Sequence, residues 1–161
     1  MYRRISFTVI SLFLASLLLV SEAAAQTAVA TPDNPDQSEL LKNSKDPDFI
    51  LHNFKTMYVD ARDARYFDSE QMKAALGRNK GFAALHITMV DDPRVADVVL
   101  KVSYTFAWDY PFELRHQNTT TVLLAGKGIG PFSGPAGAAS VAYEFVQAAK
   151  ERRAVPKDKQ K

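Results

Sequence analysis

The chain has 161 residues, no cysteine, and 20 basic against 18 acidic side chains, a net charge of +2. Without cysteine there are no disulfides and no thiolate zinc ligands, so a folded domain must be held together by the burial of apolar surface. A charge this balanced, with no basic face, argues against phosphate-backbone binding, and we expect no nucleic-acid partner.

The first 25 residues have the three parts of a cleavable secretion signal. Two arginines are followed by an apolar stretch over residues 5–20, and three alanines precede the expected cut between Ala25 and Gln26. The stretch is shorter than the roughly 20 residues that a membrane-spanning helix needs, so we favour cleavage over a retained anchor. The sequence predicts an exported protein, periplasmic or extracellular, without stable membrane insertion after cleavage.

The chain after the cut divides by composition. Residues 26–48 hold three prolines among polar residues and are predicted to form a flexible leader. Residues 49–153 are periodic in hydrophobicity and suit one domain. Arg152 and Arg153 are interpreted as a solvated helix end, followed by a basic disordered tail over residues 154–161.

The first elements of the domain alternate between strand and helix. Residues 54–61 suit a largely buried strand, and a helix capped by Asp68 or Ser69 follows it. Residues 85–89 alternate between apolar and polar side chains, the pattern of a half-buried strand. The run Asp91-Asp92-Pro93 ends this strand because proline lacks a backbone N–H.

The second half of the domain predicts three strands and a helix. Residues 98–108 give the strongest strand signal, and residues 110–117 continue the alternation into a hairpin turn at 118–120 and a strand over 121–127. An amphipathic helix over 136–153 ends the domain. The order β-α-β-β-β-β-α predicts an α+β fold, a two-layer α/β sandwich with the helices on one face of a mixed sheet.

Three short motifs carry a family resemblance: Val90-Asp91-Asp92-Pro93, Ala96-Asp97 and Trp108-Asp109-Tyr110. This VDDP, AD and WDY signature resembles small secreted bacterial proteins of unknown function. The layout over residues 54–150 is similar to envelope-assembly α/β domains, such as the N-terminal domain of the Tol–Pal translocation protein and the periplasmic domain of the curli-secretion channel. The chain departs from that pattern at residues 118–120, which replace the usual hairpin glycine. The resemblance implies a non-enzymatic module of the cell envelope or extracellular space.

The titratable residues form no recognisable catalytic motif. His52, His86 and His116 are far apart in the sequence, so no metal-binding helix pair exists. His86 falls on the polar phase of its strand, and His116 lies beside a turn where partial exposure is expected. Asp91 and Asp92 are adjacent strand residues that point to opposite faces, so a turn is favoured over an acid–base pair.

The glycine-rich run from Gly126 to Gly137 lies between a strand and a helix, where phosphate loops occur. Lys127 precedes the loop and Ser133 stands where a dinucleotide fingerprint has its third glycine, so a plain connection is favoured and we expect no cofactor. The alternative to a binding module is an unrecognised hydrolase or small-ligand carrier that uses Asp91, Asp92, His86 or this loop.

Five aromatic side chains recur at every second position, namely Tyr104, Phe106, Trp108, Tyr110 and Phe112. A sharp turn near residue 109 would bury the later ones, whereas a gentle bend would present Trp108, Tyr110 and Phe112 as an open patch. We favour burial and keep the patch as a candidate partner-binding surface. The leading hypothesis is a non-enzymatic exported domain that binds a protein, through an aromatic-edged sheet end or by strand addition at the second hairpin.

Overall fold

The computed structural model describes residues 35–130 and 134–154. The strands are β1 (Thr56–Asp63), β2 (Thr88–Val90), β3 (Val98–Ser103), β4 (Asp109–His116) and β5 (Val122–Ile129). The helices are α1 (Pro35–Asn43), α2 (Pro47–Asn53), α3 (Ser69–Arg78), α4 (Lys80–Ala83) and α5 (Gly134–Ala154), with short 3-10 turns η1 (Pro93–Val95) and η2 (Phe106–Trp108).

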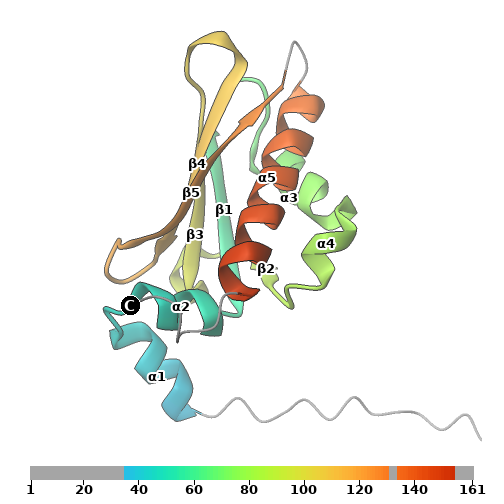
Figure 1. The fold of residues 1–161 in the computed structure, drawn as a ribbon. Coiled ribbons are helices and arrows are strands. Elements are labelled where there is room, and N and C mark those ends of the chain that lie inside the picture. The colour runs from blue at the N-terminus through green and yellow to red at the C-terminus, as the bar shows by residue number, and fades with distance from the viewer. Residues whose placement is uncertain (1–34, 131–133, 155–161) are drawn as a thin grey trace, which may run out of the picture. The chain divides into compact units, whose positions relative to one another are not determined.

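The sheet is mixed, with the strand order β2-β1-β3-β4-β5. β1 pairs in parallel with β2 and β3, whereas β3, β4 and β5 form an antiparallel meander. Helices α3, α4 and α5 lie together on one side of the sheet (Figure 1). This two-layer arrangement confirms the expected α+β fold class.

The covered face of the sheet carries the core. Val98, Leu100 and Val102 on β3 lie opposite His116, Leu114 and Phe112 on β4. All six are buried, as the alternation over residues 98–116 predicts for one face. The side of α5 that packs on them is equally apolar, with buried Ala138, Val141, Ala142, Phe145, Val146 and Ala149.

The other face of the sheet is polar. Asp60, Lys101 and Glu113 lie side by side on β1, β3 and β4. A side-chain hydrogen bond from Arg62 lowers the pKa of Asp60, and Lys127 Nζ lies 2.8 Å from Asp109 Oδ2. Exposed ion pairs of this kind contribute little to the stability of the fold.

Helix α5 approaches the edge strand β5 to within backbone contact. A Cβ atom added to Gly128 would lie 2.7 Å from the backbone nitrogen of Val141 and 2.8 Å from its Cα. Ser140 Oγ accepts a hydrogen bond of 2.9 Å from the backbone N–H of Ile129, at the end of β5. Glycine in β5 is therefore what allows the helix to lie so close to the strand.

The end of α5 is anchored by Arg153. Its Nε, Nη1 and Nη2 donate hydrogen bonds to the carbonyl oxygens of Leu51 (2.9 Å), Leu85 (2.8 Å) and Phe54 (3.1 Å). The guanidinium carbon lies 4.3 Å from the centroid of the Phe54 ring, and burial lowers the pKa of Arg153. This side chain differs from the expected solvated helix end, because it joins α5 to the end of α2 and to the segment before β2.

Two predicted strands are shorter than expected. The chain turns at His86, whose φ is 53°, so β2 begins only at Thr88, although Leu85 and Ile87 are still buried. β3 ends at Ser103 rather than continuing to Trp108, because residues 106–108 form η2. The alternation of apolar residues therefore runs on through two segments that leave the sheet.

Two helices precede β1 and correct the expectation of a flexible leader over residues 26–48, because α1 lies within that segment and α2 begins inside it. Asp46 Oδ1 accepts hydrogen bonds from the backbone N–H groups of Asp48 and Phe49, and Pro47 occupies the first turn, which together begin α2. Ile50 on α2 belongs to the core. Over the described ranges, no helix is long and apolar enough to cross a membrane.

Candidate functional site

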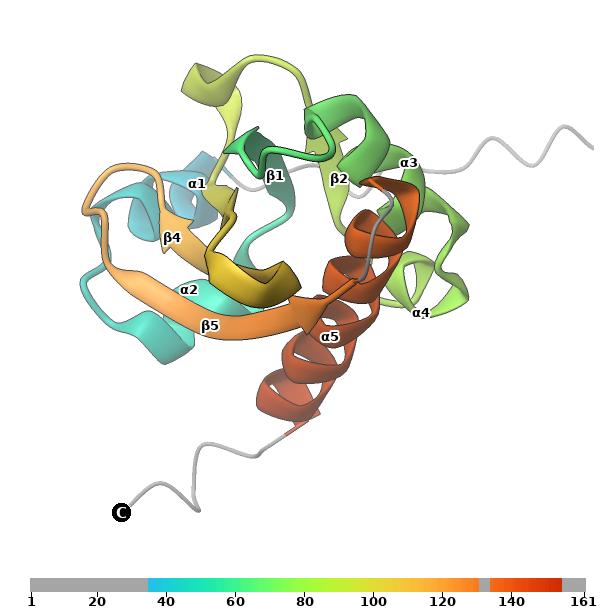
Figure 2. The same ribbon diagram turned by 90° about the horizontal axis from the view of Figure 1, so that it is seen from above.

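An aromatic cluster lies where β3 ends and β4 begins. We call it the aromatic tip and define it as Tyr66, Tyr104, Phe106 and Trp108 with Arg65. The Tyr66 ring centroid lies 5.2 Å from that of Tyr104 and 5.3 Å from that of Trp108. Arg65 and Tyr66 come from the connection between β1 and α3, and Tyr104, Phe106 and Trp108 come from the turn between β3 and β4 (Figure 2). Two connections distant in sequence thus build one surface.

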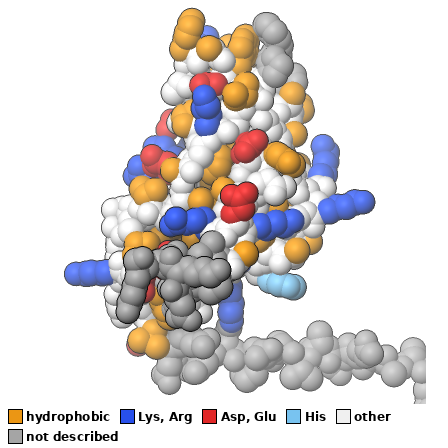
Figure 3. All heavy atoms as spheres, viewed as in Figure 1, with side chains coloured by type: hydrophobic (Ala, Val, Ile, Leu, Met, Phe, Trp, Pro, Cys, Tyr) orange, Lys and Arg blue, Asp and Glu red, His pale blue; other side chains and the backbone are white. Residues whose placement is uncertain are grey.

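The tip is open to solvent. Phe106 is 92% exposed and Tyr66 is 39% exposed, and Ile129 at the end of β5 is 59% exposed. Hydrophobic side chains gather at this end of the domain in the space-filling view (Figure 3). Because the Phe106 ring adds almost nothing to the core, the folding of the domain gives no reason for an aromatic residue at this position.

The backbone under the tip is strained. Arg65, Ala107 and Trp108 have φ values of 58°, 65° and 66°, in the left-handed region that side chains disfavour. Each such residue costs about 1–2 kcal/mol. Hydrogen bonds from Thr105 N–H to the Asp109 carbonyl (2.9 Å) and from Gly130 N–H to the Trp108 carbonyl (3.2 Å) hold the turn. The fold therefore stabilises a costly conformation that keeps Phe106 exposed.

Arg65 gives the tip its charge. The guanidinium carbon lies 5.4 Å from the centroid of the Tyr66 ring and 5.7 Å from that of Tyr104, within the range of cation–π attraction. Arg65 is exposed and forms no salt bridge with any residue in the described ranges. The tip thus presents the exposed ring of Phe106 beside the positive charge of Arg65.

The aromatic patch considered in the sequence analysis does not form as such. Tyr110 and Phe112 are 0% and 1% exposed, because the chain reverses before β4 and turns them onto the core face. Only Trp108 of the three remains partly exposed. The Tyr110 hydroxyl is buried and has no hydrogen-bond partner among the described residues, and burial raises the pKa of Tyr110.

The acidic pair and His86 do not converge on one point. Asp91 Oδ1 lies 2.5 Å from Lys73 Nζ on α3, whereas Asp92 caps η1 through the backbone N–H of Arg94 and pairs with its side chain. His86 is exposed, as expected, but it lies on a separate turn and not on the predicted strand. Within the described ranges, no three His, Asp or Glu side chains are grouped to hold a metal ion.

The glycine-rich run is mostly not a loop. Gly126 and Gly128 belong to β5, and Gly134 and Gly137 belong to α5. A Cβ on Gly137 would lie 2.9 Å from the Tyr110 ring. These glycines serve close packing between strand, helix and ring, which corrects the expectation of a connecting loop. The expected cut between Ala25 and Gln26 lies outside the described residues.

His116 is more buried than its position beside a turn suggested. The side chain is 2% exposed, and its Nδ1 lies 2.8 Å from Thr119 Oγ1. Burial lowers the pKa of His116, partly opposed by the charge of Asp97. The imidazole is therefore held in its neutral form at the end of β4.

We expect the stability of the protein to fall as the pH is lowered below about 6.5, the ordinary pKa of histidine. The lowered pKa means that the unfolded chain binds the His116 proton first, so protonation favours unfolding. The contribution of His116 to the free energy of unfolding is fully present above that pH. It is lost as the pH falls towards the lower pKa of the folded state. Urea unfolding at pH 7 and pH 5 measures it. If the stability of the His116→Asn variant fell equally, His116 would not be the group responsible.

Comparison of the chain with family models, with curated proteins and with solved structures finds no match.

Proposed function

We propose that this chain is an exported bacterial protein-interaction module that binds a protein partner through the aromatic tip. Export is supported by the arginines, apolar stretch and alanines of residues 1–25. The observation that carries the binding role is the 92% exposure of Phe106 on a strained turn beside Trp108. Strain at a functional site persists only where the surrounding structure enforces it, as the hydrogen bonds of this turn do.

The chemistry of the tip favours a protein partner. Aromatic residues and arginine are enriched at the centres of protein interfaces, where a few of them supply most of the binding energy. Phe106 offers a ring for an apolar pocket, and Arg65 offers a cation for a carboxylate beside that pocket. The partner we propose therefore has an apolar cavity with an acidic rim.

We expect Phe106→Ser to remove partner binding while leaving the domain folded. An exposed interface anchor typically contributes 2 kcal/mol or more, so the partner's Kd should rise by roughly thirtyfold or more. Proteins from an envelope extract would be captured on the wild-type chain and identified, and each would then be purified and titrated by calorimetry. Unfolding curves of the variant should match those of the wild type.

Tyr143→Ser is the matched control, since Tyr143 is 55% exposed on α5 and outside the tip. This variant should bind the partner with unchanged affinity. If both substitutions weaken binding equally, or if neither does, the tip is not the interface. Binding to lipid vesicles without any purified protein partner would also contradict the proposal.

A further inference from the structure

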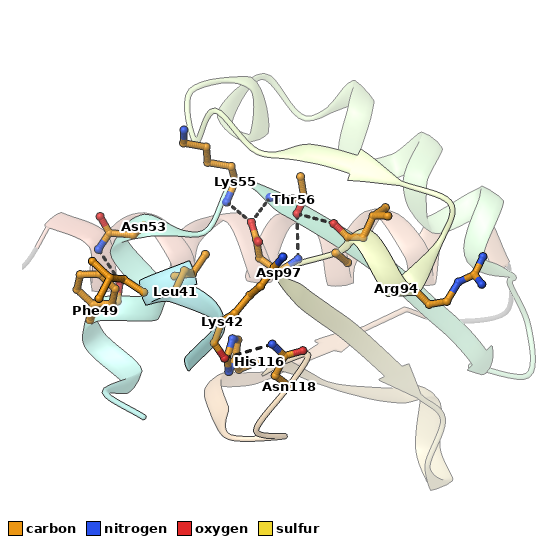
Figure 4. A pocket seen from close by; sticks show the side chains of 13 residues that line it. Leu41, Lys42, Phe49, Asn53, Lys55, Thr56, Arg94, Asp97, His116 and Asn118 are labelled. Carbon is orange, nitrogen blue, oxygen red and sulfur yellow. Dashed lines mark hydrogen bonds between the residues drawn. The ribbon is translucent and has the colours of Figure 1, made fainter. Parts of the chain in front are cut away.

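A pocket of about 650 Å³ lies at the other end of the meander, where β3 begins and β4 ends. Its walls come from α1, the end of α2, the start of β1, η1 and the β4–β5 turn (Figure 4). A volume of this size lies within the range of small-molecule sites, which is about 300–1,000 Å³. The pocket shares no residue with the aromatic tip.

Backbone hydrogen bonds fix one wall of the pocket. Asp97 Oδ2 accepts hydrogen bonds of 2.9 Å from the backbone N–H groups of both Lys55 and Thr56. Thr56 Oγ1 in turn accepts a hydrogen bond of 2.9 Å from the Asp97 N–H. These reciprocal bonds tie β1 to β3, as Figure 4 shows, so this wall is in place before any ligand arrives.

His116 supplies an unused polar group in the pocket lining. Its Nδ1 is occupied by Thr119, whereas Nε2 has no hydrogen bond to any residue in the described ranges. This nitrogen is not among the enclosed side-chain atoms of the described residues that lack a partner, so it faces the pocket and is available to hydrogen-bond a ligand group or solvent there.

The rest of the lining is apolar with a basic rim. Leu41 and Phe49 contribute apolar surface, Leu41 being only 5% exposed. Among the charged lining residues, Arg94 is neutralised by Asp92, and the Asp97 carboxylate already accepts two backbone N–H groups. Lys42 forms no salt bridge with the described residues, which leaves a cation at the rim.

We propose that this pocket binds a small amphipathic anion, with its apolar body against Leu41 and Phe49 and its anionic group held by Lys42 and His116. This site is independent of the proposed partner-binding tip, because it lies at the opposite end of β3 and β4. A carboxylate or sulfonate on an apolar body of about drug size is the ligand class that the lining fits.

The test uses the anionic fluorophore 8-anilinonaphthalene-1-sulfonate as the probe of the folded protein. We expect saturable binding with increased fluorescence, displaced by decanoate and at least about tenfold less well by decanol, which lacks the charge. Lys42→Gln should weaken probe binding about tenfold, and this exposed residue can be changed without disturbing the fold. His116→Gln should weaken it as well.

Two control variants locate the site. Lys127→Gln removes a cation from the polar sheet face and Phe106→Ser alters the tip, and both should leave probe affinity unchanged. Amide NMR signals of Asp97 and Asn118 should shift on titration, whereas that of Phe106 should not. The proposal is overturned if the probe does not bind, if Lys42→Gln binds like the wild type, or if decanol displaces as well as decanoate. If Phe106→Ser alone lost probe binding, the probe would bind at the aromatic tip and not in the pocket, which would also overturn the proposal.

Discussion

Arg153→Ala is expected to lower the free energy of unfolding by about 3 kcal/mol, because it leaves three carbonyl oxygens near the core without their charged donor. The substitution also removes the contact between the guanidinium and the Phe54 ring. Chemical denaturation followed by circular dichroism measures the change. Arg153→Lys should recover only part of the loss, since one ammonium cannot reproduce the three-way planar geometry.

The neighbouring residue provides the control. Arg152 Nη2 lies 3.8 Å from Asp48 Oδ1 in a half-exposed pair, so Arg152→Ala should cost less than about 1 kcal/mol. Equal effects of the two alanine substitutions would show that Arg153 acts only through the general charge of the helix end.

Gly128→Val is expected to destabilise the domain by about 3 kcal/mol or more, the upper end of the range for overpacking. The added Cβ would overlap the Val141 backbone of α5, which cannot move aside as a flexible side chain can. The measurement is the same denaturation experiment, together with the fraction of protein that remains soluble.

A second glycine tests whether this cost comes from crowding. A Cβ on Gly77 in α3 would have no atom within 4 Å, so Gly77→Ala should stabilise the domain by about 0.5–1 kcal/mol through its better helix propensity. If Gly128→Val were as well tolerated as Gly77→Ala, the close helix–strand contact would not hold in solution.

The fold could be predicted from the sequence where the spacing of hydrophobic residues and the helix-capping residues indicate the same element. The helix at residues 69–78 begins as expected, because Asp68 and Gln71 form a reciprocal capping box. The N-terminal helices were not predicted, because three prolines among polar residues favour a flexible segment over residues 26–48. The pair Asp46-Pro47 does carry a helix signal, since it is an N-cap followed by a favoured first-turn proline. The strand predicted over residues 85–89 forms only from Thr88, because the chain turns at His86 with a positive φ and no glycine signals that turn.

The candidate sites were less accessible to sequence reasoning. The turn after β3 contains no Gly, Pro or Asn, and aromatic residues continue the strand pattern through it, so Trp108 and Phe106 were read as part of one strand. Tyr66 joins the tip only through tertiary packing. The pocket likewise depends on α1 lying near His116, which no local pattern of residues encodes.

The hydrogen bonds of Arg153 also bear on the order in which native contacts form. The carbonyl oxygens that accept them, those of Leu51, Leu85 and Phe54, lie 102, 68 and 99 residues away in the sequence. Contacts between residues so far apart require the closure of long loops, which costs conformational entropy and slows folding. The fastening of the end of α5 is therefore expected to come late in folding, after the hairpins of the meander have formed.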